Sequence, residues 1–344
     1  MATTQSSGAL QACFASAVYT HRGMMLVSII TPSYNQASFL EQTIQSVLTQ
    51  NYTHLEYLIV DGGSTDGSLE IIQRYADRLS WWVSEPDSGQ AEAINKGLAH
   101  ARGEIVAWLN SDDIYLPGAV TSITAGFQAN PQAVMVYGNM LAINESSRIM
   151  NMLRFKQLSL EELLAFNIIG QPTVFMRRAA LEQAGGLDTS FHYLLDHHLW
   201  LRLACLGEIR YIDALWAAAR YHRGAKNLAH AAEFGREAFR ILAWAKDQPD
   251  LAPILARTER RARASAHRVD ARYLLDSGQS WAALQAWGRA FALHPPAALA
   301  RLNLFTSAML DLCGLGRLRS VYLHWRQERF SNHTEYPPNL PDTR

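Results

Sequence analysis

From residue 26 onward, short runs of apolar and β-branched residues alternate with segments in which apolar residues recur at helical spacing. This pattern predicts four buried strands with helices between them, the strands lying at residues 26–31, 55–60, 79–84 and 105–110. Strands that alternate with helices are typical of a parallel sheet covered by helices. We therefore predict an α/β fold built on a Rossmann-like, mostly parallel sheet with helices on both faces.

After Pro117 the pattern is less regular, and then it becomes helical. The sequence predicts a hairpin at 133–152, a helix at 158–166, a strand at 172–176, a helix at 194–207 and an extended segment at 208–222. Beyond Ala229 nearly every segment has helical spacing. Residues 273–296 resemble one tetratricopeptide-like helix pair, which is too short for a free solenoid and should pack on the rest of the chain or on a partner.

These changes of pattern divide the chain into four parts. We expect a loose extension at 1–24, an α/β domain at 25–228, a helical C-terminal region at 229–330 and a disordered, proline-rich tail at 331–344.

Composition narrows the class of protein. The chain has 344 residues, of which 49% are apolar, and its 31 Lys and Arg balance 31 Asp and Glu, so a nucleic-acid partner is not expected. Its three cysteines, Cys13, Cys205 and Cys313, have neither zinc nor disulfide spacing, which indicates a reducing cytoplasm. No apolar run reaches the roughly 18 to 20 residues of a membrane span. We expect a soluble, cytoplasmic protein.

Polar residues follow each of the four predicted strands, at the sheet edge where ligands bind in such folds. The first strand is followed by neither GxGxxG nor GxxxxGK[ST], so a dehydrogenase and a P-loop enzyme both lack their phosphate-binding loop. Polar and glycine-rich residues stand there instead, at 32–35, 61–64, 85–90 and 111–113.

Four residues at these positions each allow two interpretations. Asp112 and Asp113 are adjacent carboxylates, which suit Mg²⁺ or Mn²⁺ bound with a diphosphate, or which cap the following helix. Asp61 could accept hydrogen bonds from a base or ribose, or form the turn before two glycines. Tyr34 could stack on a base or close the edge of the core.

Four ordered blocks resemble the family-two, inverting glycosyltransferases of the GT-A fold. The resemblance covers roughly residues 25–227 and is carried by VSIITPSYNQASFLEQTIQSVLTQNY, LEYLIVDGGSTDGSLEII, SEPDSGQAEAINKGLAHARGEIVAWLNSDDIYLPGA and GGLDTSFHYLLDHHLWLRLA.

The resemblance implies a nucleotide-sugar site along the sheet edge. The nucleoside would contact Thr31, Pro32, Tyr34 and Asp61, with Asp61 addressing the base, and the ribose and diphosphate would contact Asp87, Gln90 and Asn95. Ser111, Asp112 and Asp113 stand at the DxD-type motif, with Ser111 at its first acidic position. Asp113 is then the expected metal ligand, and Asp112 is expected to face the donor ribose or sugar.

The resemblance also implies a catalytic base and a second metal contact. Asp196 matches the base, which takes the proton of the acceptor hydroxyl. His222 matches a histidine placed by the metal or diphosphate, and Arg220, Arg223 and Lys226 could neutralise phosphate charge. We expect His197 and His198 to be solvent-exposed or to bond the acceptor rather than to bind metal.

The implied activity is inverting transfer of a sugar from a nucleotide diphosphate-sugar, UDP- or dTDP-hexose as a first guess, to a hydroxyl of a glycan or lipid-linked acceptor in envelope polysaccharide, lipopolysaccharide or other glycoconjugate assembly. A nucleotide-sugar-binding scaffold without turnover is the alternative. Six arginines between Arg257 and Arg272 form either a solvated helix face or a contact with the inner face of an anionic membrane. The sequence does not indicate an oligomeric state.

Overall fold

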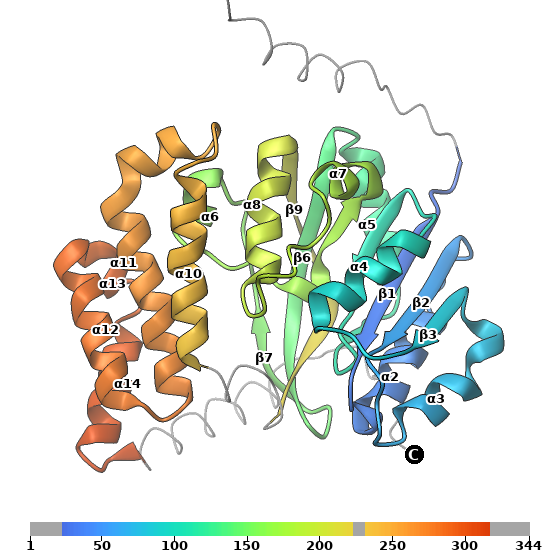
Figure 1. The fold of residues 1–344 in the computed structure, drawn as a ribbon, viewed down its shortest axis with the longest axis horizontal. Coiled ribbons are helices and arrows are strands. Elements are labelled where there is room, and N and C mark those ends of the chain that lie inside the picture. Colours follow the sequence, from blue (N-terminus) through green and yellow to red (C-terminus); the bar gives the residue numbers. More distant parts are fainter. Residues whose placement is uncertain (1–22, 223–230, 317–344) are drawn as a thin grey trace, which may run out of the picture.

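One nine-stranded mixed sheet forms the centre of the molecule, and helices cover its two faces (Figure 1). The computed structural model describes residues 23–222 and 231–316, so the expected 1–24 extension, apart from its last two residues, and the 331–344 tail lie outside the described residues. The strand order is β3-β2-β1-β4-β8-β6-β9-β5, and β7 pairs with β6.

The strands are β1 (Val27–Ser33), β2 (Leu55–Asp61), β3 (Trp81–Ser84), β4 (Ile105–Trp108), β5 (Ile114–Tyr115), β6 (Ala133–Asn144), β7 (Ile149–Leu153), β8 (Phe175–Arg177) and β9 (Glu208–Tyr221). The helices before β9 are α2 (Ala37–Leu48), α3 (Ser68–Arg74), α4 (Gln90–His100), α5 (Ala119–Ala129), α6 (Leu160–Leu164), α7 (Arg178–Gln183) and α8 (Leu195–Leu206), with the 3₁₀ turns η1 (Ala76–Arg78) and η2 (Gln171–Thr173). The helices after β9 are α10 (Ala231–Ala245), α11 (Ala252–Asp276), α12 (Ser280–Leu293), α13 (Pro295–Leu299) and α14 (Leu302–Leu312).

The four strands expected from the sequence form one parallel half of the sheet. β1 pairs in parallel with both β2 and β4, and β2 pairs in parallel with β3. The other half is mixed, because β8 runs antiparallel between β4 and β6 while β9 runs parallel to β6. This arrangement confirms the predicted α/β class and its mostly parallel, Rossmann-like sheet.

Alternation along the strands sends neighbouring side chains to opposite cores. Ile29 packs in the core beneath α2, α3 and α5, whereas Ile30 packs in the core that α4 and α8 cover. Both side chains are fully buried. The predicted cover of helices on both faces is therefore confirmed.

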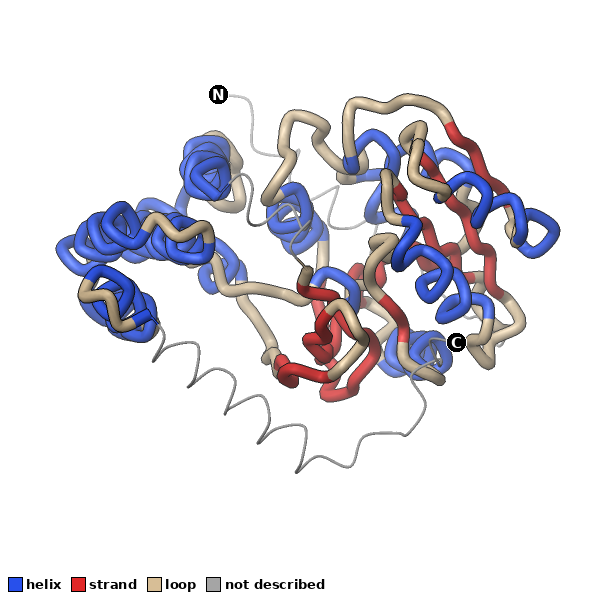
Figure 2. Tube along the Cα trace, turned by 90° about the horizontal axis from the view of Figure 1, so that it is seen from below, coloured by secondary structure: helices blue, strands red, loops and turns tan. Residues whose placement is uncertain are grey.

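The C-terminal helices lie together at one side of the sheet (Figures 1 and 2), and α10 lies beside α8 (Figure 1). Ile241 and Leu242 of α10 share a core with Leu199 and Trp200 of α8. The helix pair expected at 273–296 consists of the end of α11 and all of α12, and it has its own small core with α13 and α14, which includes Trp287.

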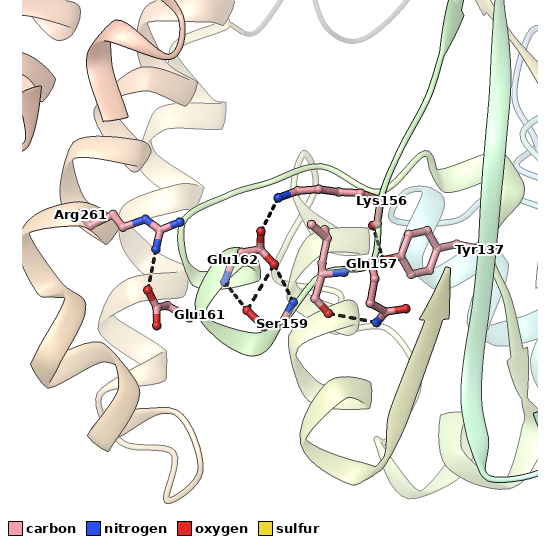
Figure 3. Close-up of polar contacts among 8 residues, drawn as sticks. Tyr137, Lys156, Gln157, Ser159, Glu161, Glu162 and Arg261 are labelled. Atoms are coloured by element: carbon pink, nitrogen blue, oxygen red, sulfur yellow. Dashed lines mark hydrogen bonds and ion pairs between the residues drawn. The ribbon is translucent and has the colours of Figure 1, made fainter. Parts of the chain in front are cut away.

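α6 joins this helical region to the sheet (Figure 3). Ser159 and Glu162 form a capping box at the start of α6, and Glu161 beside it forms an ion pair with Arg261 of α11. Arg268 of α11 donates to the carbonyl of Ala165 at the end of α6. Part of the arginine-rich face is thus used to dock α11 internally. Among the described residues, no helix is long and apolar enough to span a membrane.

The packing of α8 on the sheet yields a prediction. Trp200 stacks on Trp108 of β4 with ring centroids 5.3 Å apart, and both rings are buried. Trp200→Ala should lower the free energy of unfolding by about 3–5 kcal/mol, because it leaves a cavity between α8 and the sheet. Trp281→Ala, at an exposed tryptophan, is the control and should cost less than about 0.5 kcal/mol. Equal urea midpoints for the two variants would contradict the prediction.

Candidate active site

The carboxyl ends of β1, β2 and β3 lie side by side. Ser33 pairs with Asp61, and Asp61 pairs with Ser84, so the three strands end in register. The loops that follow them carry the polar residues identified in the sequence. These loops form one edge, at the position where α/β sheets bind ligands.

Asp61 uses its carboxylate within its own turn. It is fully buried, and it accepts hydrogen bonds from the backbone N–H groups of Gly63 and Ser64 at 3.2 and 2.9 Å. The hydroxyls of Ser64 and Ser84 donate to the same carboxylate at 2.5 and 2.7 Å. Oδ2 accepts three of these bonds and Oδ1 accepts one. Asp61 therefore forms the turn before the two glycines, and its Oδ1 keeps a lone pair.

Two other expected donor contacts also have structural partners. Thr31 is fully buried, and its hydroxyl lies 3.0 Å from that of Tyr57, so it faces the core. Asn95 exchanges two hydrogen bonds with the backbone of Leu187, at 2.8 and 2.9 Å, and so ties α4 to the loop before α8. Both are explained by a role in the fold. Pro32 is buried in β1, whereas Tyr34 is 62% exposed at the sheet edge.

Asp87 is the carboxylate that lies over the end of β2. A Cβ atom added to Gly62 would come within 2.9 Å of Oδ2 of Asp87, so the missing side chain at 62 makes room for this carboxylate. Its Oδ1 accepts the N–H of Gly89 at 2.8 Å, at the start of α4. The carboxylate of half-buried Asp87 therefore lies at the same edge as Asp61.

Asn110, which sequence reasoning did not single out, connects the centre of the edge. It accepts from the side-chain amide of Gln90 at 2.7 Å and donates to Gln171 and Asp113 at 3.1 and 3.3 Å. Gln171 in turn donates to the carbonyl of Trp108 at 2.9 Å. The signal available in the sequence was the position of Asn110 directly after a buried strand. These amides fix the loop that carries the acidic pair.

Asp112 and Asp113 have different surroundings. Asp113 is 5% exposed, and its Oδ1 accepts the backbone N–H of Arg220 at 2.9 Å, so β9 meets it from the side. Burial, followed by the charge of Asp112, raises the pKa of Asp113 well above its ordinary value. Oδ2 of Asp112 lies 3.0 Å from Nε2 of His222, at the end of β9. Ser111 beside them is buried.

This geometry bears on the roles expected for the two acidic residues. Asp113 is engaged by the backbone of Arg220 and the amide of Asn110, whereas Asp112 lies next to the expected metal contact, His222. Arg220 is itself committed within the fold, since its guanidinium donates to Gln42 at 2.6 Å and to backbone carbonyls, one of which belongs to Asp112. The expected phosphate contacts Arg223 and Lys226 lie outside the described residues.

One carboxylate and one imidazole suit a phosphate-bound divalent cation. No group of three or more potential metal ligands occurs within residues 23–222 and 231–316. Mg²⁺ and Mn²⁺ sites that act on diphosphates take one or two protein ligands, and phosphate and water oxygens complete the shell. Asp112 and His222 fit that kind of site.

Asp196 occupies the first turn of α8. One oxygen accepts the backbone N–H of His197 at 2.7 Å. Burial, and to a smaller extent the charge of Glu237, raise the pKa of Asp196 to about 6. A carboxylate whose pKa lies close to neutral pH can take a proton from a hydroxyl and can release that proton afterwards.

The amino-acid sequence is similar to those of known glycosyltransferases. The family model described as "Glycosyl transferase family 2" matches residues 28–185. The putative teichuronic acid biosynthesis glycosyltransferase TuaG of Bacillus subtilis is 32% identical over 204 residues, which are 55% of this chain and 80% of TuaG. This chain belongs to glycosyl transferase family 2. It spans 64% of the length of two uncharacterised Rickettsia glycosyltransferases that are 28% identical.

Solved structures show that this family 2 chain has the GT-A-like fold. TarS 1-349 of S. aureus in complex with UDP-GlcNAc matches with a TM-score of 0.55 and 18% identity over 91% of this chain and 93% of TarS 1-349. The mannosyltransferase PcManGT of Pyrobaculum calidifontis in complex with GDP-Man and Mn²⁺ matches with a TM-score of 0.55 and 21% identity over 96% of each chain. Both likenesses extend beyond the sheet into the C-terminal helices.

The histidines that follow Asp196 in this family 2 chain are buried, contrary to the expected exposure. His197 lies within 2.9 Å of the carbonyl of Leu163 and stacks on Phe166. His198 packs between Phe191 and Trp244, and neither of its ring nitrogens has a partner within the described part of the chain. Burial lowers the pKa of each to about 4, so both are neutral at pH 7. Amphipathic spacing could not reveal this, because α10 covers the second side of α8.

His198 predicts a specific pH dependence of stability. An unfolded histidine gains its proton near pH 6.5, whereas folded His198 gains it near 4, so stability is full above about pH 6.5 and falls as the pH drops to 4. Between pH 7 and 4, the free energy of unfolding of His198→Leu should therefore fall by less than that of wild type, by a difference on the order of 3 kcal/mol. Denaturant unfolding at several pH values measures it, with the exposed His54→Leu as the control. Parallel curves for wild type and His198→Leu would refute the assignment.

Proposed function

We propose that this family 2 protein transfers a sugar from a nucleotide diphosphate-sugar to an acceptor hydroxyl by inverting displacement. The observation that carries the proposal is Asp196, a partly buried carboxylate in the first turn of α8 whose pKa is raised, chiefly by burial, to about 6. At neutral pH most of it is ionised and able to accept a proton. The Asp112–His222 pair at the end of β4 supports a site for the diphosphate.

Asp196 acts on the acceptor. It takes the proton of the attacking hydroxyl while the oxygen forms a bond to the anomeric carbon, on the face opposite the leaving diphosphate. An α-linked donor then gives a β-linked product. Within residues 23–222 and 231–316 no positively charged group shares a hydrogen bond with its carboxylate, so Asp196 retains the basicity that this step needs.

Asp112 and His222 act on the donor side. We propose that both residues face the diphosphate. Asp113 accepts the backbone N–H of Arg220 and fixes the loop. Asp112 and His222 would hold Mg²⁺ or Mn²⁺, and such a cation neutralises the charge that develops on the departing diphosphate. Asp87 and Gln90 at the start of α4 are the remaining donor contacts that the geometry favours.

The names of the relatives suggest the substrates. TuaG is named for teichuronic acid biosynthesis, and TarS and PcManGT are described in complex with UDP-GlcNAc and GDP-Man. We propose a UDP- or dTDP-hexose donor and a glycan or lipid-linked acceptor in cell-envelope polysaccharide assembly. Such an acceptor suits a cytoplasmic protein at the inner face of the membrane, where exposed Arg257, Arg260 and Arg263 of α11 could meet anionic lipid.

The role of Asp196 can be tested directly. Asp196→Asn should lower kcat for transfer by at least about a hundredfold, since the amide cannot take a proton at neutral pH, and donor affinity should change less than about threefold. A screen of nucleotide-sugars by thermal shift with Mn²⁺ identifies the donor for the assay. Wild-type turnover by Asp196→Asn would disprove the assignment of the base, and donor binding without any wild-type turnover would favour a binding scaffold.

The division of roles between the two acidic residues gives a second test. Asp112→Asn should raise the Mn²⁺ concentration needed for half-maximal activity by about tenfold or more, because it removes a charged ligand next to His222. Asp113→Asn keeps an oxygen for the N–H of Arg220 and should change that concentration less than about threefold. A larger effect at Asp113 than at Asp112 would restore Asp113 as the principal ligand.

A further inference from the structure

The helix that carries Asp196 has no cap of its own. Leu194 stands at its N-cap position and makes no side-chain cap hydrogen bond. Leucine is among the poorest N-cap residues, because it has no acceptor for the free N–H groups of a first turn. The backbone before Asp196 therefore needs an acceptor from elsewhere in the chain.

Glu237 of α10 supplies that acceptor from 43 residues away. Its Oε1 accepts the N–H of His192 at 2.7 Å, and its Oε2 accepts those of Tyr193 and Leu194 at 2.9 and 2.7 Å. The glutamate is 4% exposed, so these bonds are shielded from water. Three consecutive N–H groups that converge on one carboxylate form an anion-binding nest, at the positive end of the α8 dipole.

α10 also holds the same loop through side chains. Arg240 lies over the ring of Phe191 at 4.4 Å and donates to the carbonyl of Ser190 at 3.1 Å. Tyr193 packs on Phe234 of α10 with centroids 5.1 Å apart. Phe234 in turn stacks at 3.6 Å on Tyr273 of α11. The loop that leads into Asp196 is therefore fixed by the C-terminal helices rather than by the sheet.

We propose that Glu237 is a positioning residue for Asp196, and that through it the C-terminal helices complete the active site. This inference rests on the proposed function of Asp196 as the base. Glu237 touches no substrate in this role. It fixes the backbone two to four residues before Asp196, and so sets the direction in which that carboxylate points.

The charge of Glu237 adds a measurable signature. Asp196 is faced by Glu237 from α10 and by Tyr273 from α11, while His197 beside it is neutral. Glu237 is the negative charge that raises the pKa of Asp196 after burial. Removing this charge lowers the pKa of Asp196, so the acid limb of the kcat profile should move to lower pH.

The experiment compares Glu237→Gln with Glu233→Gln in the full chain. Glu233 lies one turn earlier on the same helix and pairs at the surface with Arg236, so it is a matched control for loss of a charge on α10. For Glu237→Gln we expect kcat to fall by about tenfold or more, because a displaced base loses alignment, with the donor KM changed less than about twofold. The acid limb should move to lower pH, and Glu233→Gln should match wild type in all three measurements.

Amide hydrogen exchange gives a readout that does not depend on turnover. Exchange at His192, Tyr193 and Leu194 should be at least about tenfold faster in Glu237→Gln than in wild type or Glu233→Gln. Unchanged exchange, or wild-type kcat and pH profile in folded Glu237→Gln, would overturn the proposal. If wild type turns over no nucleotide-sugar, the proposed function fails, while faster exchange still establishes the contact. Should Glu237→Gln be unfolded, a role in stability alone would replace positioning.

Discussion

The parallel register of β1 with β2 and β4 is the constraint on which the site depends. Because of this register, neighbouring strands end at one edge of the sheet. Asp61 is the last residue of β2, and Asp87 and Asp112 lie in the loops that follow β3 and β4. Most residues within β1, β2 and β4 are apolar and buried, so the polar residues that could meet a ligand lie at or after the strand ends. The site is therefore a consequence of where the strands stop.

Buried polar contacts then sort the acidic residues by task. Asp61 and Asp113 are satisfied by hydrogen bonds within the protein, and each fixes a loop. Asp112 and Asp87 each keep a carboxylate oxygen at the edge, beside His222 and Gly62 respectively. A buried carboxylate needs internal donors, and Asp61 and Asp113 have them from backbone N–H groups. We propose that Asp87 and Asp112 contact the ligand.

The base side of the site is organised by a different part of the molecule. α8 is packed on the sheet through Trp200 and is held at its start by Glu237 of α10. The C-terminal helices are thus more than an appended bundle, because their packing bears on the loop before Asp196. Arg261 and Arg268 extend the same docking to α6, which explains part of the arginine content of α11.

The sequence by itself determined the sheet, its helical cover and the segments that end at the site. It did so because the spacing of apolar residues and the turn residues are local signals, and both are clear between residues 26 and 110. The tertiary structure alone decided which contacts Asp112 and Asp113 make. Those contacts depend on donors such as the backbone N–H of Arg220, which lies 107 residues from Asp113. The tertiary structure also decided that His197 and His198 are buried and that Glu237 meets Leu194. Contacts of this kind form only when distant elements pack, and no spacing along the chain encodes them.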